Sequence, residues 1–108
     1  MTLTRTLVIA FAAGIATAAV AAGTERSITQ KGKVFSESEV AIKKGETVVF
    51  VNDDTVSHNI MSNTSGNAFN LGSQAPGIST PVTFDKSGDI TVICAIHPRM
   101  KMTVKVSD

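Results

Sequence analysis

The stretch TPVTFDKSGDITVI, residues 80–93, carries the clearest fold signal in this 108-residue chain. Thr80–Phe84 and Asp89–Ile93 are short runs rich in β-branched residues, and the turn residues Asp85–Gly88 separate them. Two such runs joined by a short polar turn that contains Gly are typical of a β-hairpin. The stretch therefore predicts two antiparallel strands.

The same pattern continues along the chain in both directions from this hairpin. Further short strands are expected at residues 27–34 (interrupted by Gly32), 40–43, 47–51, 57–61 and 102–106, whereas residues 62–78 have the composition of a long loop. The run Thr47–Val51 is apolar enough to be buried on both faces. No stretch shows sustained helical periodicity. About six to eight short strands with frequent turns indicate an all-β fold, a β-sandwich or small barrel.

The first 21 residues differ in composition from the rest of the chain. Met1–Arg5 is a short polar start with one positive charge, Thr6–Ala19 is apolar and uncharged, and Ala19–Ala21 offers small residues for cleavage. This three-part form is typical of a secretory signal peptide. A membrane anchor is the alternative, but the stretch is near the lower length limit for a bilayer span. We therefore expect residues 1–21 to be a cleaved signal peptide and residues 22–108 to be the exported domain, with cleavage after Ala21 or Ala22.

Charge and cysteine content exclude several classes of protein. The chain has ten Lys and Arg against nine Asp and Glu, and losing Arg5 with the signal leaves nine against nine, a net charge of zero. The cations are scattered, so no basic stripe indicates a nucleic-acid partner. The single Cys excludes an intramolecular disulfide. A free thiol in an oxidising compartment needs burial, an intermolecular disulfide, or a metal that binds it as thiolate.

Candidate metal ligands gather near the C-terminus. Cys94–Met102, CAIHPRMKM, contains the Cys, one of the two His residues (His97) and two of the four Met residues, and the other His is His58. On a loop between strands, this spacing lets a thiolate, an imidazole and a thioether converge. A second imidazole would complete His2Cys with a weak axial Met, the ligand set of a blue-copper site. Taken alone, a single Cys such as Cys94 is more often a buried apolar thiol than a ligand. His58 taken alone would fit a hydrogen-bonded strand residue, and His97 an exposed loop residue as well as a ligand.

Three segments together resemble the cupredoxin family, and within it the amicyanin, pseudoazurin and plastocyanin group. Val40–Asn52 resembles the strand–Gly–acid–Thr–strand–Asn segment that precedes the first ligand. Ser57–Ile60 resembles the His-Asn-Val segment, and Cys94–Met100 has C-x2-H-x2-M spacing with Pro after the His. The resemblance extends over nearly the whole exported domain.

This resemblance implies a Greek-key β-sandwich with one type 1 copper that cycles between Cu(II) and Cu(I). It implies that His58 and His97 bind copper through ring nitrogens, Cys94 through its thiolate and Met100 axially. It also implies a soluble, monomeric periplasmic electron carrier rather than an enzyme, with no stable membrane insertion after signal cleavage. Its partners would be redox proteins, such as a dehydrogenase donor and a c-type cytochrome acceptor.

Met102 competes with Met100 for the axial position, because it gives the C-x2-H-x4-M spacing of plastocyanin and pseudoazurin. In these families, residues four and six places after the axial Met tend to face the core. Counted from Met100 these residues are Val104 and Val106, whereas counted from Met102 they are Val106 and Asp108. The alternation of the last strand therefore favours Met100.

Two positions depart from the family pattern. Ala95 stands where Ser or Thr often follows the Cys, so a hydroxyl that would brace Asn59 is missing. Ile96 stands where amicyanin and pseudoazurin have Pro. We expect its backbone N–H to point at the thiolate and raise the reduction potential.

Electron transfer is the function these features favour. Copper binding for tolerance or delivery is the alternative, because Met100 and Met102 would suit soft Cu(I). A zinc hydrolase or Cys-His enzyme ranks below both, since no acid or base partner is evident nearby and the domain is small for a substrate pocket. Asp53 and Asp54 are expected to form a solvated turn rather than a cation site.

Overall fold

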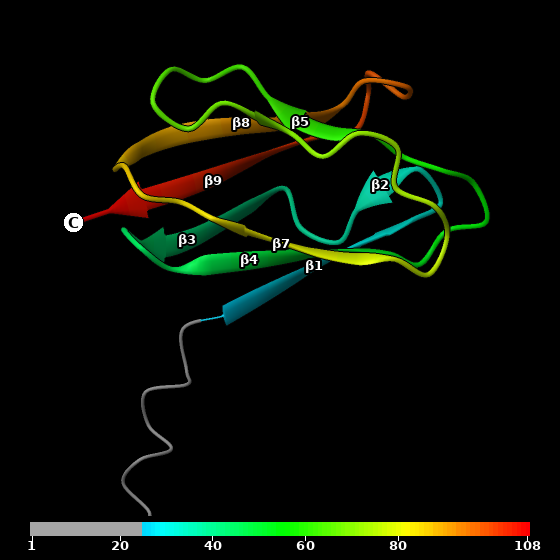
Figure 1. The fold of residues 1–108 in the computed structure, drawn as a ribbon, viewed down its shortest axis with the longest axis horizontal. Coiled ribbons are helices and arrows are strands. Elements are labelled where there is room, and N and C mark those ends of the chain that lie inside the picture. The colour runs from blue at the N-terminus through cyan, green and yellow to red at the C-terminus, as the bar shows by residue number, and fades with distance from the viewer. Residues whose placement is uncertain (1–24) are drawn as a thin grey trace, which may run out of the picture.

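The computed structural model describes residues 25–108, and in this part of the chain strands alternate with turns and loops (Figure 1). The strands are β1 (Glu25–Lys31), β2 (Val34–Phe35), β3 (Glu39–Lys43), β4 (Thr47–Asn52), β5 (Ile60–Ser62), β6 (Phe69–Asn70), β7 (Ser79–Thr83), β8 (Gly88–Cys94) and β9 (Lys101–Ser107). The predicted signal peptide, residues 1–21, lies outside the described residues. Within residues 25–108, no helix has the length and apolar character needed to cross a membrane.

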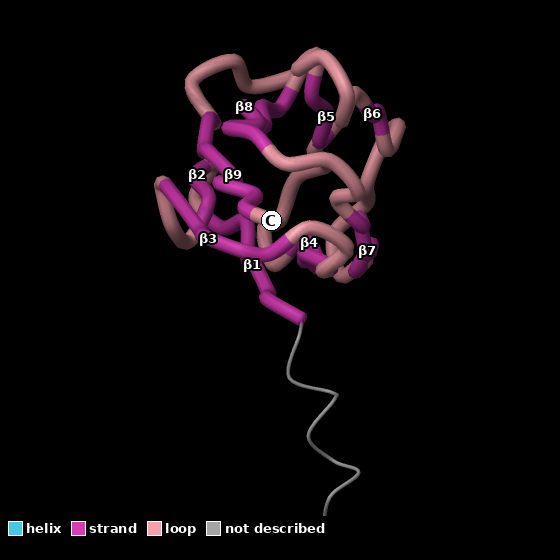
Figure 2. Tube along the Cα trace, turned by 90° about the vertical axis from the view of Figure 1, so that its left-hand side faces the viewer, coloured by secondary structure: helices cyan, strands magenta, loops and turns pink. Residues whose placement is uncertain are grey.

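The strands form two sheets that pack face to face (Figures 1 and 2). One sheet has the order β2-β1-β4-β7 and the other β3-β9-β8-β5-β6. β1 pairs with β4 in parallel, as does β3 with β9, and the remaining strand pairs are antiparallel. This arrangement confirms the predicted all-β sandwich. The predicted hairpin over residues 80–93 is wrong, because its two strands β7 and β8 lie in different sheets and the turn between them crosses from one sheet to the other. The structure has more strands than expected, because the two-residue strands β2 and β6 are too short to leave a periodic signal.

The core lies between the sheets and is built from alternate residues of the long strands. In β9, Val104 and Val106 are buried while Lys105 is exposed, as the alternation predicts. The same alternation in β4 buries Val48 and Phe50, but Thr47, Val49 and Val51 on the other face are half-buried. The expectation that β4 is buried on both faces is therefore wrong, because its second face lies on the outside of a two-layer sandwich (Figure 1).

Two predicted strands are interrupted by turns or bridges. The run 27–34 breaks at Gly32 and Lys33, whose left-handed backbone angles (φ 65° and 60°) turn the chain from β1 into β2. The run 57–61 joins the sheet only from Ile60, because His58 instead makes an isolated bridge with Gln74. The predicted loop 62–78 therefore contains both β6 and a segment that pairs with a predicted ligand.

Truncating a core side chain should cost far more stability than the same truncation at the surface. Ile90 in β8 is fully buried, and Ile78 is 48% exposed. We expect Ile90→Ala to lower the free energy of unfolding of the copper-free domain by about 2–5 kcal/mol, since it leaves a cavity between the sheets. Ile78→Ala should change it by about 0.5 kcal/mol or less. Urea denaturation checks both, and equal losses would contradict the assigned core.

Candidate metal centre

The predicted ligands come from two connections at one end of the sandwich. Cys94 ends β8, His97 lies in the following loop, and Met100 directly precedes β9. His58 lies in the connection between β4 and β5. Because β5 pairs with β8 and places Ile60 opposite Cys94, it brings His58 beside a loop that is 36 residues away in sequence.

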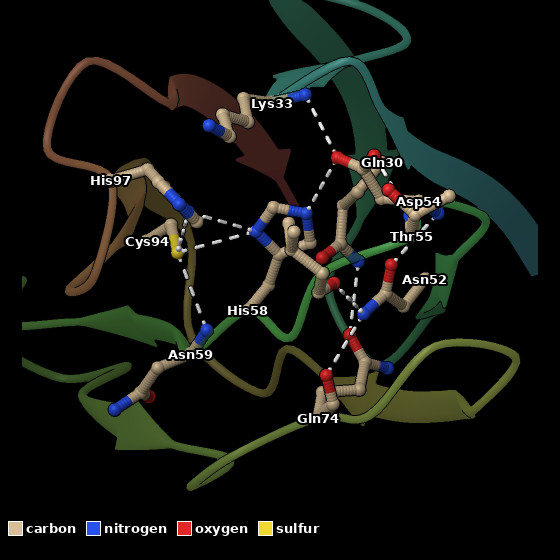
Figure 3. A network of polar contacts seen from close by, with 11 residues as sticks. Gln30, Lys33, Asn52, Asp54, Thr55, His58, Asn59, Gln74, Cys94 and His97 are labelled. Carbon is tan, nitrogen blue, oxygen red and sulfur yellow. Dashed lines mark hydrogen bonds and ion pairs between the residues drawn. The ribbon is translucent and has the colours of Figure 1, made fainter.

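Three of the predicted ligand atoms converge on one point (Figure 3). The Nδ1 atoms of His58 and His97 each lie 3.7 Å from Sγ of Cys94, and they lie 3.2 Å from each other. A metal about 2.0 Å from nitrogen and about 2.3 Å from sulfur in a trigonal plane would hold nitrogen and sulfur about 3.7 Å apart. It would hold the two nitrogens about 3.5 Å apart, so the observed triangle accepts a metal with little movement.

The predicted ligands are buried except for the imidazole ring of His97. Cys94 and His58 are fully buried and Met100 is 2% exposed. His97 is half-buried, and Ile96 beside it is 52% exposed. Of the four predicted ligands, His97 alone therefore has a substantially exposed side chain.

Backbone hydrogen bonds distinguish the two candidate methionines, which are both buried. In the β8–β9 pairing, Met102 lies opposite Val92, and its side chain belongs to the core face together with Val104. Met100 lies two residues before Met102, and its carbonyl accepts a hydrogen bond from the Cys94 N–H at 3.2 Å. Its N–H also donates to the His97 carbonyl at 2.8 Å. Met100 is thus the methionine tied to the ligand loop.

The cysteine sulfur accepts a hydrogen bond from the backbone. The N–H of Asn59 lies 3.3 Å from Sγ of Cys94, and the carbonyl of Asn59 accepts from the N–H of Ala95 at 2.9 Å. The expected donation from Ile96 is not among the hydrogen bonds that the described residues make to this sulfur. The residue that follows His58 therefore takes the role we expected of Ile96.

The backbone of His58 is held by Gln74, a residue that the sequence did not single out. The two residues exchange N–H···O=C bonds of 3.0 and 2.7 Å. The Gln74 side chain is also buried, where its Oε1 accepts from Gln30 Nε2 and its Nε2 lies 2.9 Å from the Phe50 carbonyl. Asn52 Nδ2 donates to the Gln74 carbonyl at 2.9 Å. The sequence signal for this cluster was limited to Gln30 and Asn52, which take buried positions in β1 and β4, whereas Gln74 lies in the predicted loop 62–78.

Asp54 contacts His58 from the side opposite Cys94 (Figure 3). Its Oδ2 lies 3.0 Å from His58 Nε2, and its side chain is 10% exposed. Hydrogen bonds from the backbone N–H groups of Lys33 and Thr55 hold the pKa of Asp54 well below its usual range. The expectation that Asp54 belongs to a solvated turn is therefore wrong, because the β1–β2 turn and His58 enclose it.

The donor set decides which metal the site can hold. Thiolate and imidazole are borderline-to-soft ligands that bind copper in both of its common oxidation states, and a thioether adds a weak axial ligand. Mg²⁺ and Ca²⁺ require hard oxygen ligands, and the convergent atoms here are nitrogen and sulfur. The residues present therefore fit copper.

Comparisons with known proteins agree with this assignment. Residues 22–107 match the model of a family described as copper binding proteins, plastocyanin/azurin family. The search of curated protein sequences found no match.

Three solved structures resemble the chain. Amicyanin from Paracoccus versutus is 26% identical with a TM-score of 0.71, over 79% of this chain and 83% of that one. A purple cupredoxin from Nitrosopumilus maritimus is 28% identical with a TM-score of 0.68, over 76% and 99%. A copper-containing nitrite reductase from Thermus scotoductus is 27% identical with a TM-score of 0.72, over 78% of this chain but 22% of the reductase.

A missing hydroxyl near the ligand loop gives a stability prediction. The side-chain Oδ1 of Asn59 is buried without a hydrogen-bond partner among the described residues, and Ala95 is hydrogen-bonded to the Asn59 backbone. We expect Ala95→Ser to supply the partner and to raise the free energy of unfolding by about 1 kcal/mol. In an Asn59→Ala background the gain should vanish. The same gain in both backgrounds, measured by urea denaturation, would contradict the interaction.

Proposed function

This chain belongs to the plastocyanin/azurin family of copper-binding proteins, and from that premise we propose that it is a one-electron carrier rather than an enzyme. Its cofactor is copper. We propose that His58 and His97 would hold it through ring nitrogens, Cys94 through its thiolate and Met100 through a weak thioether contact. The convergence of two imidazole nitrogens and one thiol sulfur within 4.8 Å is the observation that carries the proposal.

The protein's own contribution is a fixed ligand arrangement. Bound copper supplies a centre that gains and loses one electron. Cu(II) and Cu(I) prefer different geometries, so ligands that cannot rearrange keep the reorganisation energy low. Cys94 is held by the β5–β8 pairing and the Met100 carbonyl, and His58 by its bridge to Gln74. These contacts supply the rigidity that an electron carrier needs.

Because Cys94, His58 and Met100 are buried, His97 is the ligand through which electrons would enter and leave the site. Fully buried Cys94 and His58 exclude water and substrate from the inner side of the site. The exposed side of His97 opens on a shallow pocket of about 340 Å³, lined by Lys33, Ile96, His97, Pro98 and Arg99. We propose that a redox protein docks on this surface, as the family resemblance implies, so that its own centre comes close to the His97 ring.

The charge around this pocket indicates the kind of partner. Lys33 and Arg99 line it, and no carboxylate does. The Lys–carboxylate pairs of the described residues are Lys44–Asp108 and Lys105–Asp89, so neither Lys33 nor Arg99 is neutralised in this way. A partner with carboxylates around its redox centre fits this rim.

The proposed location follows from the N-terminal composition. We propose that residues 1–21 are removed as a signal peptide and that residues 22–108 act as a monomer in the periplasm. A dehydrogenase that donates electrons and a c-type cytochrome that accepts them are the partner classes that the family resemblance suggests. We rank copper delivery lower, because Met102 lies opposite Val92 within β9 and only Met100 of the two directly adjoins the ligand loop.

Copper loading tests the carrier role directly. We expect the exported domain to bind one Cu(II) with an intense thiolate-to-copper absorption band, narrow EPR hyperfine splitting and a reversible one-electron wave in voltammetry. Cys94→Ala should lose the band completely, because it removes the thiolate. A colourless complex, or one that binds Cu(I) alone, would exclude the proposed function.

The two methionines provide a matched control in the same experiment. Met100→Leu should shift the visible spectrum and the reduction potential, because it removes the axial thioether. Met102→Leu should leave both unchanged, because Met102 lies within β9 opposite Val92, two residues beyond the ligand loop. The reverse result would move the axial ligand to Met102.

The charge of the docking surface gives a kinetic prediction. We expect oxidation of the Cu(I) protein by the anion hexacyanoferrate(III) to slow by about threefold to tenfold in Arg99→Glu at low ionic strength. Lys86→Glu makes the same change in net charge in the turn between β7 and β8, at the opposite end of the sandwich (Figure 1). Stopped-flow rates for the two variants should differ. Equal rates would show that net charge, rather than this rim, controls the encounter.

A further inference from the structure

We propose that Asp54 is a positioning residue for the copper site, which keeps the proton of His58 on Nε2 and lowers the reduction potential of the copper. This proposal rests on the proposed function and adds a residue outside the ligand set. Its basis is the contact of 3.0 Å between Asp54 Oδ2 and His58 Nε2 (Figure 3).

The carboxylate determines which nitrogen of His58 is free to bind metal. A carboxylate accepts hydrogen bonds, so the His58 nitrogen that faces it must carry the proton. Nε2 is therefore the donor, and Nδ1, which lies 3.7 Å from Cys94 Sγ, keeps its lone pair for a metal. Such carboxylate–histidine pairs fix the tautomer and ring orientation of metal ligands and raise their basicity.

Asp54 is itself held in place at both carboxylate oxygens. The N–H of Lys33 donates to Oδ2 at 2.9 Å, and the N–H of Thr55 donates to Oδ1 at 2.9 Å. The N–H of Asp54 donates to Oδ1 of the buried Asn52 at 2.9 Å. These bonds restrict rotation of the carboxylate, and they favour its ionised form.

The bond from the Lys33 N–H to Asp54 comes from the turn between β1 and β2. Lys33 has a left-handed backbone (φ 60°), a conformation that costs a non-glycine residue energy. Backbone conformations of this kind persist where surrounding contacts enforce them, and they gather at functional sites. Here the conformation accompanies a backbone N–H on the same Asp54 oxygen that His58 contacts, so it links β1 and β2 to the metal centre.

A fixed negative charge next to a ligand has a predictable effect on the potential. It stabilises the more highly charged Cu(II) state more than Cu(I), and His58 and most of the Asp54 side chain lie where solvent screening is weak. A more basic imidazole acts in the same direction. Both effects lower the potential relative to a site without the carboxylate.

Neutralising each of two adjacent aspartates tests this. Asp54→Asn keeps the size of the side chain and removes its charge, and Asp53→Asn makes the same change one residue away at an exposed position. We expect Asp54→Asn to change the ratio of Cu(I) to Cu(II) affinity by about tenfold in favour of Cu(I), which raises the potential by about 59 mV. Asp53→Asn should change the ratio by less than about twofold, because an exposed charge is screened. Asp54→Glu should restore most of the wild-type potential.

The outcomes separate this inference from the proposed function. If wild-type protein shows the thiolate–copper band and a reversible wave but both Asn variants shift the potential equally, the role of Asp54 is overturned and the carrier role stands. If wild-type protein shows neither, the proposed function fails. A second measurement needs no variant and no metal: in copper-free wild-type protein at mildly alkaline pH, nitrogen-15 NMR should find the His58 proton on Nε2. A proton on Nδ1 would overturn the inference even if Asp54→Asn does not fold.

Discussion

The buried sulfur of Cys94 is the constraint on which the rest of the site depends. A thiolate without exposure to water is costly unless positive charge or hydrogen-bond donors surround it. The structure supplies the N–H of Asn59 as a donor, and it places two imidazole nitrogens at 3.7 Å, where copper bound by them and by the sulfur would supply the positive charge. Every one of these partners reaches Cys94 through strand pairing of β8 with β5 and β9. The two sheets therefore serve chiefly to hold the other ligands in fixed positions around the sulfur of Cys94.

Behind this sulfur, polar groups take up space that a small domain would usually give to apolar packing. Gln30, Asn52 and Gln74 are buried and joined to one another and to the backbone by hydrogen bonds. Buried amides of this kind favour a single arrangement of the core when their partners are present. Because Gln74 also pairs with the backbone of His58, the bonds that join the strands also immobilise a ligand. The same hydrogen bonds thus contribute to the packing of the sandwich and to the fixed position of His58.

The β1–β2 turn lies close both to the buried ligand His58 and to the partly exposed ligand His97. The backbone N–H of Lys33 bonds to Asp54, which contacts the fully buried His58. Its side chain lines the pocket beside the half-buried His97. A single turn residue therefore contributes to the surroundings of His58 through its backbone and to the charge beside His97 through its side chain.

The strands and the C-terminal ligand loop could be predicted because both depend on residues close together in the chain. Alternating apolar residues at 102–106 and the β-branched runs at 80–84 and 89–93 indicate strands through local sequence, and the spacing of Cys94, His97 and Met100 limits how far apart these ligands can lie. Which strands pair was not local information, since the runs at 80–84 and 89–93 fall in different sheets. The family resemblance added His58, but its contact with Cys94 requires β5 to pair with β8.

Tertiary structure alone placed Gln74 behind His58, and Asn59 rather than Ile96 at the sulfur. It also turned Asp54 from an expected solvated turn residue into a partner of His58. Each of these contacts joins segments or side chains whose meeting depends on the register between strands, and register is a property of the folded sheet that no single segment encodes.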